Sequence, residues 1–225
     1  MSWCVMRVTP PPAANGILTP RATLLTSARW DIGVIRVAFL PGHGSPALRD
    51  RIKGYAQLWH GADNVGVEFR FQEQIDDTVH VRVALGGTGD WSELGRHARN
   101  NRNLALPTMN LKLTERTTAK KVMRSVLHEF GHALGLVHEH QIPGEPIQWD
   151  REAVIADLRA AGWSVSEIEA QVLAPYTADE SNTGTFDPNS IMLYPIKRSW
   201  TLNGFHVDWN RTLSDQDKAR IAELY

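Results

Sequence analysis

The chain is poor in the features that mark several large protein classes. Cys4 is its one cysteine, so no disulfide can form within the chain and the usual mark of a secreted domain is missing. The 24 basic residues nearly balance the 25 acidic ones, which leaves no broad positive charge to attract nucleic acid or an anionic membrane. No apolar run approaches the roughly 20 residues that a membrane span needs. We therefore expect neither a nucleic-acid nor a membrane partner.

The amino terminus lacks a recognisable targeting signal. Residues 1–7 show no charged segment followed by an apolar core of about 7–15 residues, so they do not resemble a signal peptide. This leaves the compartment open: a cytoplasmic location, or export by a route that the chain does not encode. The length of 225 residues fits one domain with a core that needs no disulfide, and we expect a monomer.

The chain does carry one dense motif, H-E-F-G-H-A-L-G-L-V-H, at residues 128–138. His128 and His132 are four residues apart, so on a helix both imidazoles lie on one face, one turn apart. Gly135 can end the helix in a left-handed conformation, and the chain could then turn back and bring His138 alongside. Three neutral imidazoles with an open fourth position are typical of a catalytic zinc site. We therefore expect one zinc ion, Zn²⁺, as cofactor.

Glu129 follows the first histidine of the motif directly. Its carboxylate can reach a metal-bound water without being a ligand itself. Zinc lowers the pKa of such a water toward about 7, so we expect Glu129 to act as the general base and to return the proton to the leaving group. The alternative is a buried amphipathic helix whose histidines only form hydrogen bonds. Chance produces the full pattern in roughly one chain in ten thousand, which favours the metal site.

The segments around the motif predict an α+β fold. Amphipathic spacing behind Ser45 as N-cap and Pro46 at the first helical position predicts a helix over 46–60. A second helix is expected to begin near Thr117 and to run into the motif. Composition and period-two alternation predict three strands, over residues 32–40, 65–71 and 79–85.

The part of the chain after Gly135 differs in character. Asp150 and Ser164 have the positions of helix N-caps, and Ser214, three residues before an acidic residue, begins a closing helix. Residues 174–210 are expected to be mostly irregular.

These patterns suggest an extended arm and one catalytic domain. The Pro-rich arm covers 1–29, and the domain covers 30–225. Its N-terminal subdomain, 30–135, is expected to hold a twisted mixed β-sheet with two long helices. Its C-terminal subdomain, 136–225, is irregular and ends in a helix, and the active-site cleft is expected between the two.

Residues 103–113 form an extended pattern interrupted by Pro107, which predicts an edge strand because proline cannot donate within a ladder. A peptide could pair with such an edge as an added strand, so we expect proteins or extended peptides as substrates. The residues expected to line the groove are Trp91, Leu104, Ala105, Leu106, Thr108 and Met109. Arg198 could favour acidic substrate side chains there, or belong to a solvated loop.

The motif resembles that of the metzincin zinc peptidases, in which H-E-x-x-H-x-x-G-x-x-H is followed downstream by a methionine turn. Residues 190–194, S-I-M-L-Y, are similar to that turn. Within the metzincins the astacin family is the best match: the third histidine is followed by glutamate at 138–139, a tyrosine lies two residues after the methionine, and Asp-Arg follows at 150–151.

The astacin resemblance implies a metzincin-like fold and roles for several further residues. Tyr194 would donate to the oxyanion and could also ligate zinc in the resting enzyme; the alternative is a core tyrosine. Met192 would lie beneath the metal as a polarisable apolar base. In astacins the glutamate at the position of Glu139 pairs with the mature amino terminus, although here a long arm precedes the domain. Astacins are also kept latent by an aspartate, for which this chain has no clear counterpart.

The chain holds two further kinds of residue that can bind a metal, its cysteine and the histidines outside the motif. Cys4 could bind zinc and block the site, since thiolates are good ligands, or it could be incidental. His140 is not expected to be a ligand, because three imidazoles and a water already complete a tetrahedral site. Surface or structural roles are expected for the remaining histidines, His43, His60, His80, His97 and His206.

The sequence thus predicts a zinc endopeptidase. Two alternatives stay open: a metal-binding, catalytically restrained module that holds peptides, and a processing protease with one narrow target. The presence of Glu129 favours catalysis, because a module that only binds peptides needs no general base.

Overall fold

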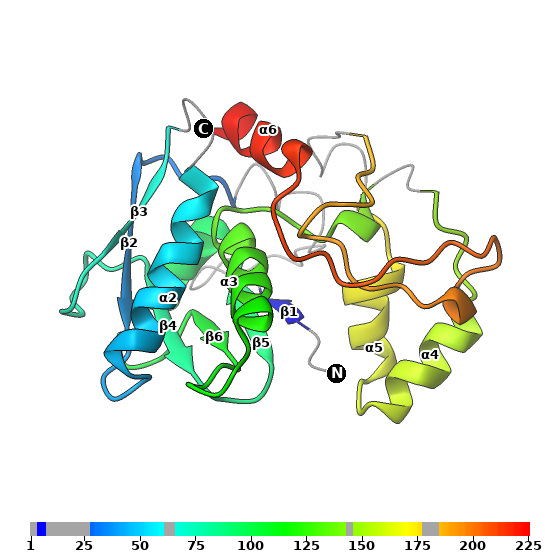
Figure 1. The fold of residues 1–225 in the computed structure, drawn as a ribbon, viewed down its shortest axis with the longest axis horizontal. Helices are drawn as coiled ribbons and strands as arrows, with labels where there is room; N and C mark the ends of the chain where they lie inside the picture. The colour runs from blue at the N-terminus through cyan, green and yellow to red at the C-terminus, as the bar shows by residue number, and fades with distance from the viewer. Residues whose placement is uncertain (1–3, 8–27, 61–65, 143–145, 177–184) are drawn as a thin grey trace, which may run out of the picture.

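The computed structural model describes residues 4–7, 28–60, 66–142, 146–176 and 185–225. Within these ranges a six-stranded mixed sheet forms in the order β1-β5-β6-β4-β2-β3 (Figure 1). The strands are β1 (Cys4–Arg7), β2 (Val34–Phe39), β3 (Glu68–Phe71), β4 (Val81–Leu85), β5 (Asp90–Glu93) and β6 (Met109–Leu111). β5 and β6 pair antiparallel, and the other neighbours pair in parallel. The predicted α+β class and mixed sheet are confirmed.

Strand β1 lies at one edge of the sheet. It pairs with β5 in a register that sets Cys4 opposite Asp90 and Arg7 opposite Glu93. The amino-terminal end of the predicted arm, Cys4–Arg7, is therefore part of the sheet. The Pro-rich residues 9–20, which suggested the arm, lie outside the described ranges.

The prediction of an edge strand at 103–113 is wrong. β6 lies between β5 and β4, and its residues are buried. Pro107 removes no hydrogen bond from the sheet, because the β6 ladder begins after it. The first bonds are donated by Thr108 N to Arg82 O (2.9 Å) and by Glu93 N to Thr108 O (2.8 Å). Since β1 covers β5, the strand that would form this edge without β1 is β5.

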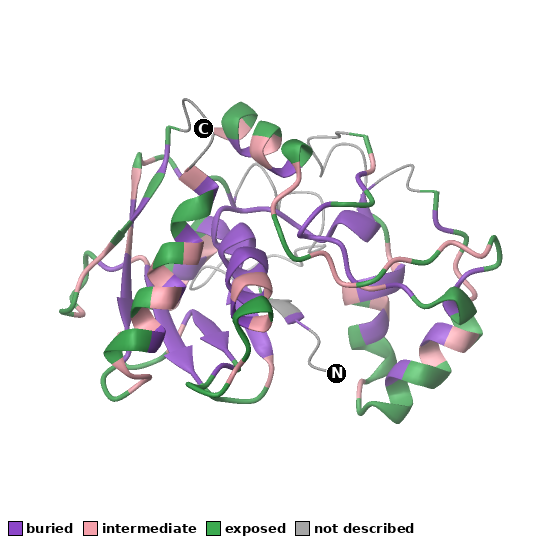
Figure 2. Ribbon diagram, viewed as in Figure 1, coloured by how far each residue is buried: buried purple, intermediate pink, exposed green. Residues whose placement is uncertain are grey.

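Two helices, α2 (Pro46–Ala56) and α3 (Ala119–Ala133), lie side by side against the sheet (Figure 1). The Ser45 hydroxyl accepts a hydrogen bond from Leu48 N (3.3 Å), as its capping position predicts, and a short 3-10 helix (Gln57–His60) extends α2 to the predicted end. α3 begins at Ala119, close to the expected start near Thr117, with Thr118 as its N-cap. Figure 2 shows that the second half of α3 is almost wholly buried.

The C-terminal half holds a second apolar cluster, built around Val154, Leu158 and Trp200. Its helices are α4 (Arg151–Ala160), α5 (Val165–Ile168), which continues as a π-helical turn (Glu169–Leu173), and α6 (Asp215–Leu224), with short 3-10 helices at Glu139–Gln141 and Arg198–Trp200. The predicted caps at Asp150, Ser164 and Ser214 are confirmed.

α6 returns to the N-terminal subdomain and buries Ile221 in that subdomain's core. Among the described residues, no helix has the length and apolarity that crossing a membrane requires.

Candidate metal centre and active site

The carboxyl end of α3 carries the first two histidines of the motif, and buried tryptophans hold it in place. Trp59 Nε1 donates to Leu127 O (3.0 Å), and Trp30 Nε1 donates to Ala133 O (2.7 Å). The helix then ends at Gly135, whose φ of 94° is a conformation that residues with a Cβ rarely adopt. The chain turns as the sequence predicts, and the third histidine is completely buried beside the helix.

The three imidazoles of the motif are each oriented by an oxygen. The Nδ1 contacts are His128 to Ile191 O (2.8 Å), His132 to Leu136 O (2.8 Å) and His138 to Gln141 Oε1 (3.3 Å). Because a carbonyl oxygen can only accept, each Nδ1 carries the proton and each Nε2 keeps its lone pair. Histidines that ligate a metal through Nε2 are held in this way.

The three Nε2 atoms face one another. Those of His132 and His138 are 3.2 Å apart, and that of His128 is buried without a hydrogen-bond partner in the described structure. The ligating atoms of these residues and the Cys4 sulfur all lie within 4.8 Å of one another. Nitrogen and sulfur ligands bind zinc at about 2.0–2.3 Å, so a single ion fits among the four atoms. Facing lone pairs are unfavourable unless a cation lies between them, and the buried cluster indicates a metal, with zinc the best match.

Burial keeps these histidines neutral. It lowers the pKa of His128 to about 4, and it lowers the pKa values of His132 and His138 well below the ordinary range. Imidazole must be deprotonated to bind a metal, so the environment favours the ligand form at neutral pH.

Glu129 is buried on α3 beside this cluster, and it accepts a hydrogen bond from the Cys4 thiol (Oε2 to Sγ, 3.1 Å). Burial raises the pKa of this carboxyl well above its ordinary value, and the nearby Asp90 raises it further. Asp90 is itself held by Ser125 Oγ (3.1 Å) and by Lys112 N (2.6 Å). The sequence predicts the neighbouring Trp91 at the groove, but nothing local marks the Asp90 carboxyl as a neighbour of Glu129.

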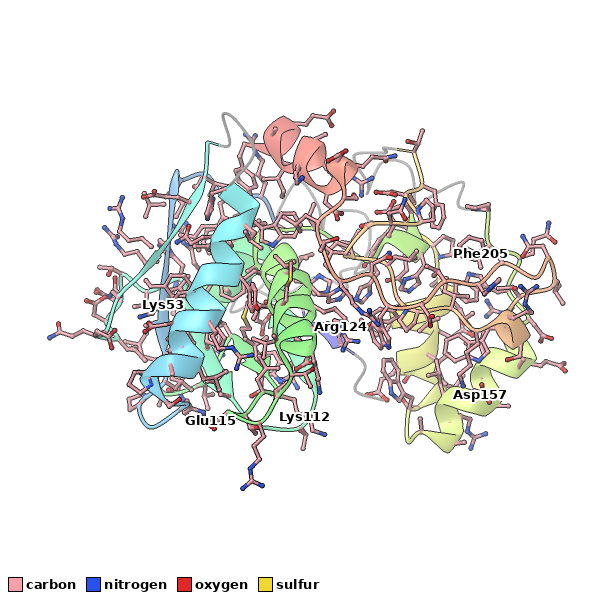
Figure 3. All side chains as sticks on the ribbon, in the orientation of Figure 1. Lys53, Lys112, Glu115, Arg124, Asp157 and Phe205 are labelled. Atoms are coloured by element: carbon pink, nitrogen blue, oxygen red, sulfur yellow. The ribbon has the colours of Figure 1, made fainter. Side chains whose placement is uncertain are left out.

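A small cavity adjoins the base, and Arg124 and Trp209 lie in its wall together with Glu129 and Cys4. The Arg124 guanidinium carbon is 3.6 Å from the centroid of the Trp209 ring. Figure 3 shows Arg124 on the side of α3 that faces the C-terminal subdomain. Sequence reasoning missed both residues, although Arg124 precedes the first histidine by one helical turn and so shares its face.

Tyr194 is buried against the histidines, with its ring centroid 4.2 Å from that of His138 and 4.7 Å from that of His140. Its hydroxyl donates to the main-chain oxygen of Cys4. Burial raises the pKa of this phenol well above its ordinary value, so it is a proton donor at neutral pH. The sequence suggested that this hydroxyl could reach zinc, whereas in this structure it binds the β1 backbone.

Met192 lies against α3 at Gly131, where a Cβ would come within 2.5 Å of the Met192 sulfur. A larger residue at 131 would therefore have to displace the Met192 sulfur, and sequence reasoning did not single out this glycine. Met192 thus lies next to the helix that carries the first two histidines. The resemblance to a metzincin turn predicts a methionine in this place.

Cys4 makes three contacts at the centre. Its sulfur joins the histidine cluster, its thiol donates to Glu129, and its carbonyl accepts from Tyr194. Of the two interpretations weighed from the sequence, incidental residue or blocking ligand, these contacts favour the second.

The residues after the third histidine have partners outside the cluster. Glu139 has no exposed surface, and its carboxylate accepts from Arg220 Nη1 (2.8 Å) and from Asp187 N (2.8 Å). His140 Nε2 lies 3.0 Å from Gln171 O, so this ring nitrogen points away from the other histidines.

The remaining predicted site residues lie in three places. Trp91 is on β5, where the Arg7 guanidinium stacks 3.7 Å from its ring. Arg198 contacts His206 Nε2 (3.2 Å) in the C-terminal subdomain. Leu104, Ala105 and Leu106 form the approach to β6, and Thr108 and Met109 are buried. The groove predicted from 104–109 rested on an edge strand that does not exist.

Three of the histidines expected to be structural accept hydrogen bonds from backbone amides of strands or strand ends. These are His43 from Leu85 N (3.0 Å), His60 from Phe69 N (2.8 Å) and His80 from Arg36 N (2.9 Å).

Comparison with protein-family models found no match, and comparison with curated proteins found none either. Among solved structures, one of myroilysin superposes with a TM-score of 0.82 at 35% sequence identity, covering 90% of this chain and 97% of that one. A second structure of myroilysin superposes with a TM-score of 0.66 at 32% identity, covering 98% of this chain and 90% of that one.

Proposed function

Because the chain belongs to the myroilysin family, we propose that it is a zinc-dependent endopeptidase of the astacin-like metzincin type. Myroilysin is a metalloprotease. One observation carries the proposal: three imidazoles, each held through Nδ1, turn their Nε2 atoms toward one buried point beside Glu129.

The metal would be held by His128, His132 and His138. When bound, zinc supplies a Lewis acid and makes water acidic enough to lose a proton near neutral pH. Glu129 lies next to these ligands and would take that proton. Because burial raises the pKa of its carboxyl, it can hold the proton and then deliver it to the leaving amine.

Tyr194 would stabilise the oxyanion of the tetrahedral intermediate. Its hydroxyl already donates to a peptide carbonyl beside the histidines, that of Cys4. A substrate carbonyl in the same place would receive the same bond. Met192 would support the histidines from below, in the manner of a methionine turn.

The substrate would be an extended peptide. β1 pairs with β5 over four residues, so this edge can bind an added strand through the main chain alone. Recognition of this kind selects unfolded or loop segments. Trp91 on β5 would then lie in the groove, where the sequence had placed it.

We infer that the arrangement described here is a restrained form of the enzyme. Cys4 lies where a water and a substrate carbonyl would have to be, and it engages both Glu129 and Tyr194. Catalysis would therefore require β1 to leave β5. The catalytically restrained module, which the sequence leaves open as an alternative, would then be one state of an active peptidase.

The test is Glu129→Gln, made in the natural sequence and in a Cys4→Ala background. We expect zinc content to stay equimolar while cleavage of a quenched-peptide library falls at least 1000-fold, because the amide cannot accept the proton. Glu152→Gln, at an exposed position on α4, is the matched control and should retain activity.

A protein that binds zinc and peptides but never cleaves them, even as Cys4→Ala, would be a binding module. Wild-type-like turnover by Glu129→Gln would remove the general-base assignment.

A further inference from the structure

The C-terminal helix α6 (red in Figure 1) directs two ionisable side chains at the metal centre from the far end of the chain. Asp217 and Arg220 are three residues apart, so they share one face of the helix. Asp217 is 3% exposed and the Arg220 side chain 18%, and they share α6 with Ile221, which is buried in the core. Both side chains bind residues that adjoin the proposed zinc ligands.

Asp217 supports the first ligand. Its Oδ1 accepts from Ser190 Oγ (2.7 Å) and its Oδ2 accepts from Ile191 N (2.9 Å). The carbonyl of Ile191 in turn accepts from His128 Nδ1 (2.8 Å). Ile191 is thus fixed on both sides, by Asp217 through its amide and by His128 through its carbonyl. The group that orients the imidazole is itself anchored to α6.

Arg220 supports the third ligand. Its Nη1 donates to Glu139 Oε2 (2.8 Å), and the other carboxylate oxygen of Glu139 accepts from Asp187 N (2.8 Å). Glu139 N donates to Met192 O (3.2 Å). Glu139 directly follows His138, so fixing its side chain and its amide fixes the backbone that carries the ligand.

The buried ion pair between Arg220 and Glu139 links Arg220 to His138 in particular. Glu139 has no exposed surface, and Arg220 is its one ion-pair partner in the described structure. Removing one partner of a buried pair leaves a charge that must regain water or move, and the segment free to move is the one bearing His138. A purely apolar contact at this place would not direct the disturbance at a ligand.

We propose that Asp217 and Arg220 are positioning residues of the metal centre: α6 fixes His128 through Ile191 and His138 through Glu139. The proposal rests on the zinc site of the proposed function. Outer groups of this kind typically change metal affinity by about 10–100-fold when removed.

The test measures zinc affinity by competition with a chromophoric chelator, at a temperature where each variant is folded by near-ultraviolet circular dichroism. We expect Arg220→Met to weaken zinc binding 10–100-fold and Arg220→Lys to restore most of the loss. Lys218→Met, an exposed position on the same helix with the same change of charge, should bind like the wild type. The visible spectrum of the Co²⁺-substituted protein should change in Arg220→Met alone of the three.

Zinc affinity of folded Arg220→Met within twofold of the wild type would overturn the proposal, as would an equal loss in Lys218→Met. If Arg220→Met does not fold, Asp217→Asn and Glu139→Gln carry the test, with weaker zinc binding expected in both and unchanged binding contradicting the proposal. Absence of zinc binding by the wild type would instead refute the proposed function itself.

Discussion

At the scale of single residues, the hydroxyl of Tyr194 is the proposed donor to the oxyanion. Loss of one such donor typically lowers kcat by about 100–1000-fold. We expect Tyr194→Phe to lower kcat by about 100-fold in the Cys4→Ala background while zinc affinity changes less than threefold, as measured by steady-state kinetics and chelator competition. Tyr55→Phe, on the half-buried side of α2, is the control. An unchanged kcat would return Tyr194 to the role of a core residue.

His80 makes the fold sensitive to acid. Its Nδ1 accepts from Arg36 N, and burial together with the Arg99 and Arg36 guanidinium groups lowers its pKa to about 4. The folded-state pKa lies below the ordinary value of 6.5, so the neutral form contributes stability above pH 6.5, and this is lost as the pH falls toward 4. Allowing for partial exposure, the loss is about 1–2 kcal/mol.

The variant His80→Asn keeps an acceptor but cannot titrate. Its free energy of unfolding should therefore fall less than that of the wild type between pH 7.5 and pH 4.5, in chemical denaturation of the zinc-free protein. His206→Asn, at an exposed position, should follow the wild type. Parallel losses in His80→Asn and wild type would exclude His80 as the cause.

The residues that could be predicted from the sequence are those whose roles follow from local spacing. The two histidines one helical turn apart and the left-handed Gly135 belong to this kind. Asp90, Arg124 and Arg220 could not be found, because their roles depend on which distant segments pack against α3. Glu139 shows the difference well: the family resemblance implies a carboxylate that pairs with the mature amino terminus, but only the fold supplies its partner Arg220, 81 residues away.

At the scale of elements, β1 is the part whose removal should change function most. Its sulfur lies among the ligating atoms of the three histidines, and its thiol donates to Glu129. We expect Cys4→Ala to raise the rate of peptide cleavage at least tenfold, because it frees Glu129 and one metal position and leaves β1 held by main-chain pairing without the sulfur, so that β1 leaves β5 more readily. Arg7→Ala, which removes the stacking on Trp91 but keeps the thiol, should raise the rate much less.

Equal activity of Cys4→Ala and wild type would show that the thiol does not restrain the enzyme. An equal gain in Arg7→Ala would attribute the restraint to strand pairing and not to the sulfur.

Helix ends could be predicted well and strand order could not. Ser45, Asp150, Ser164 and Ser214 cap helices through bonds to amides three residues away, so the signal lies within a few letters. The place of β6 in the interior depends on β4 and β5, which come from elsewhere in the chain. Pro107 lies before β6 and not within it, so it does not mark β6 as an edge strand, and the edge available to a peptide is that of β5.

At the scale of the whole molecule, the metal would join the two halves of the chain. Two of the proposed ligands lie on α3, which shares its core with the sheet, and the third proposed ligand lies beyond Gly135 in the C-terminal subdomain. A ligand that binds only the folded state at about 100 times its dissociation constant adds about 2.7 kcal/mol. For a domain of this size that corresponds to roughly 5–10 °C in Tm.

We therefore expect removal of zinc by a chelator to lower Tm by about 5–10 °C, and added zinc to restore it, as measured by differential scanning fluorimetry. The His132→Ala variant should have the lower Tm and show no response to the chelator. A wild-type Tm that does not depend on zinc would mean that the two halves are joined without the metal.

The contact between Gly131 and the Met192 sulfur limits how this motif can change over time. Position 131 falls on one of the letters that H-E-x-x-H leaves unspecified, yet even one added methyl group there meets the sulfur at 2.5 Å. Alanine at this position needs either a smaller residue at 192 or a shift of the Met192 side chain, since overpacking a core is costly. The two positions, 61 apart in the chain, are therefore expected to co-vary.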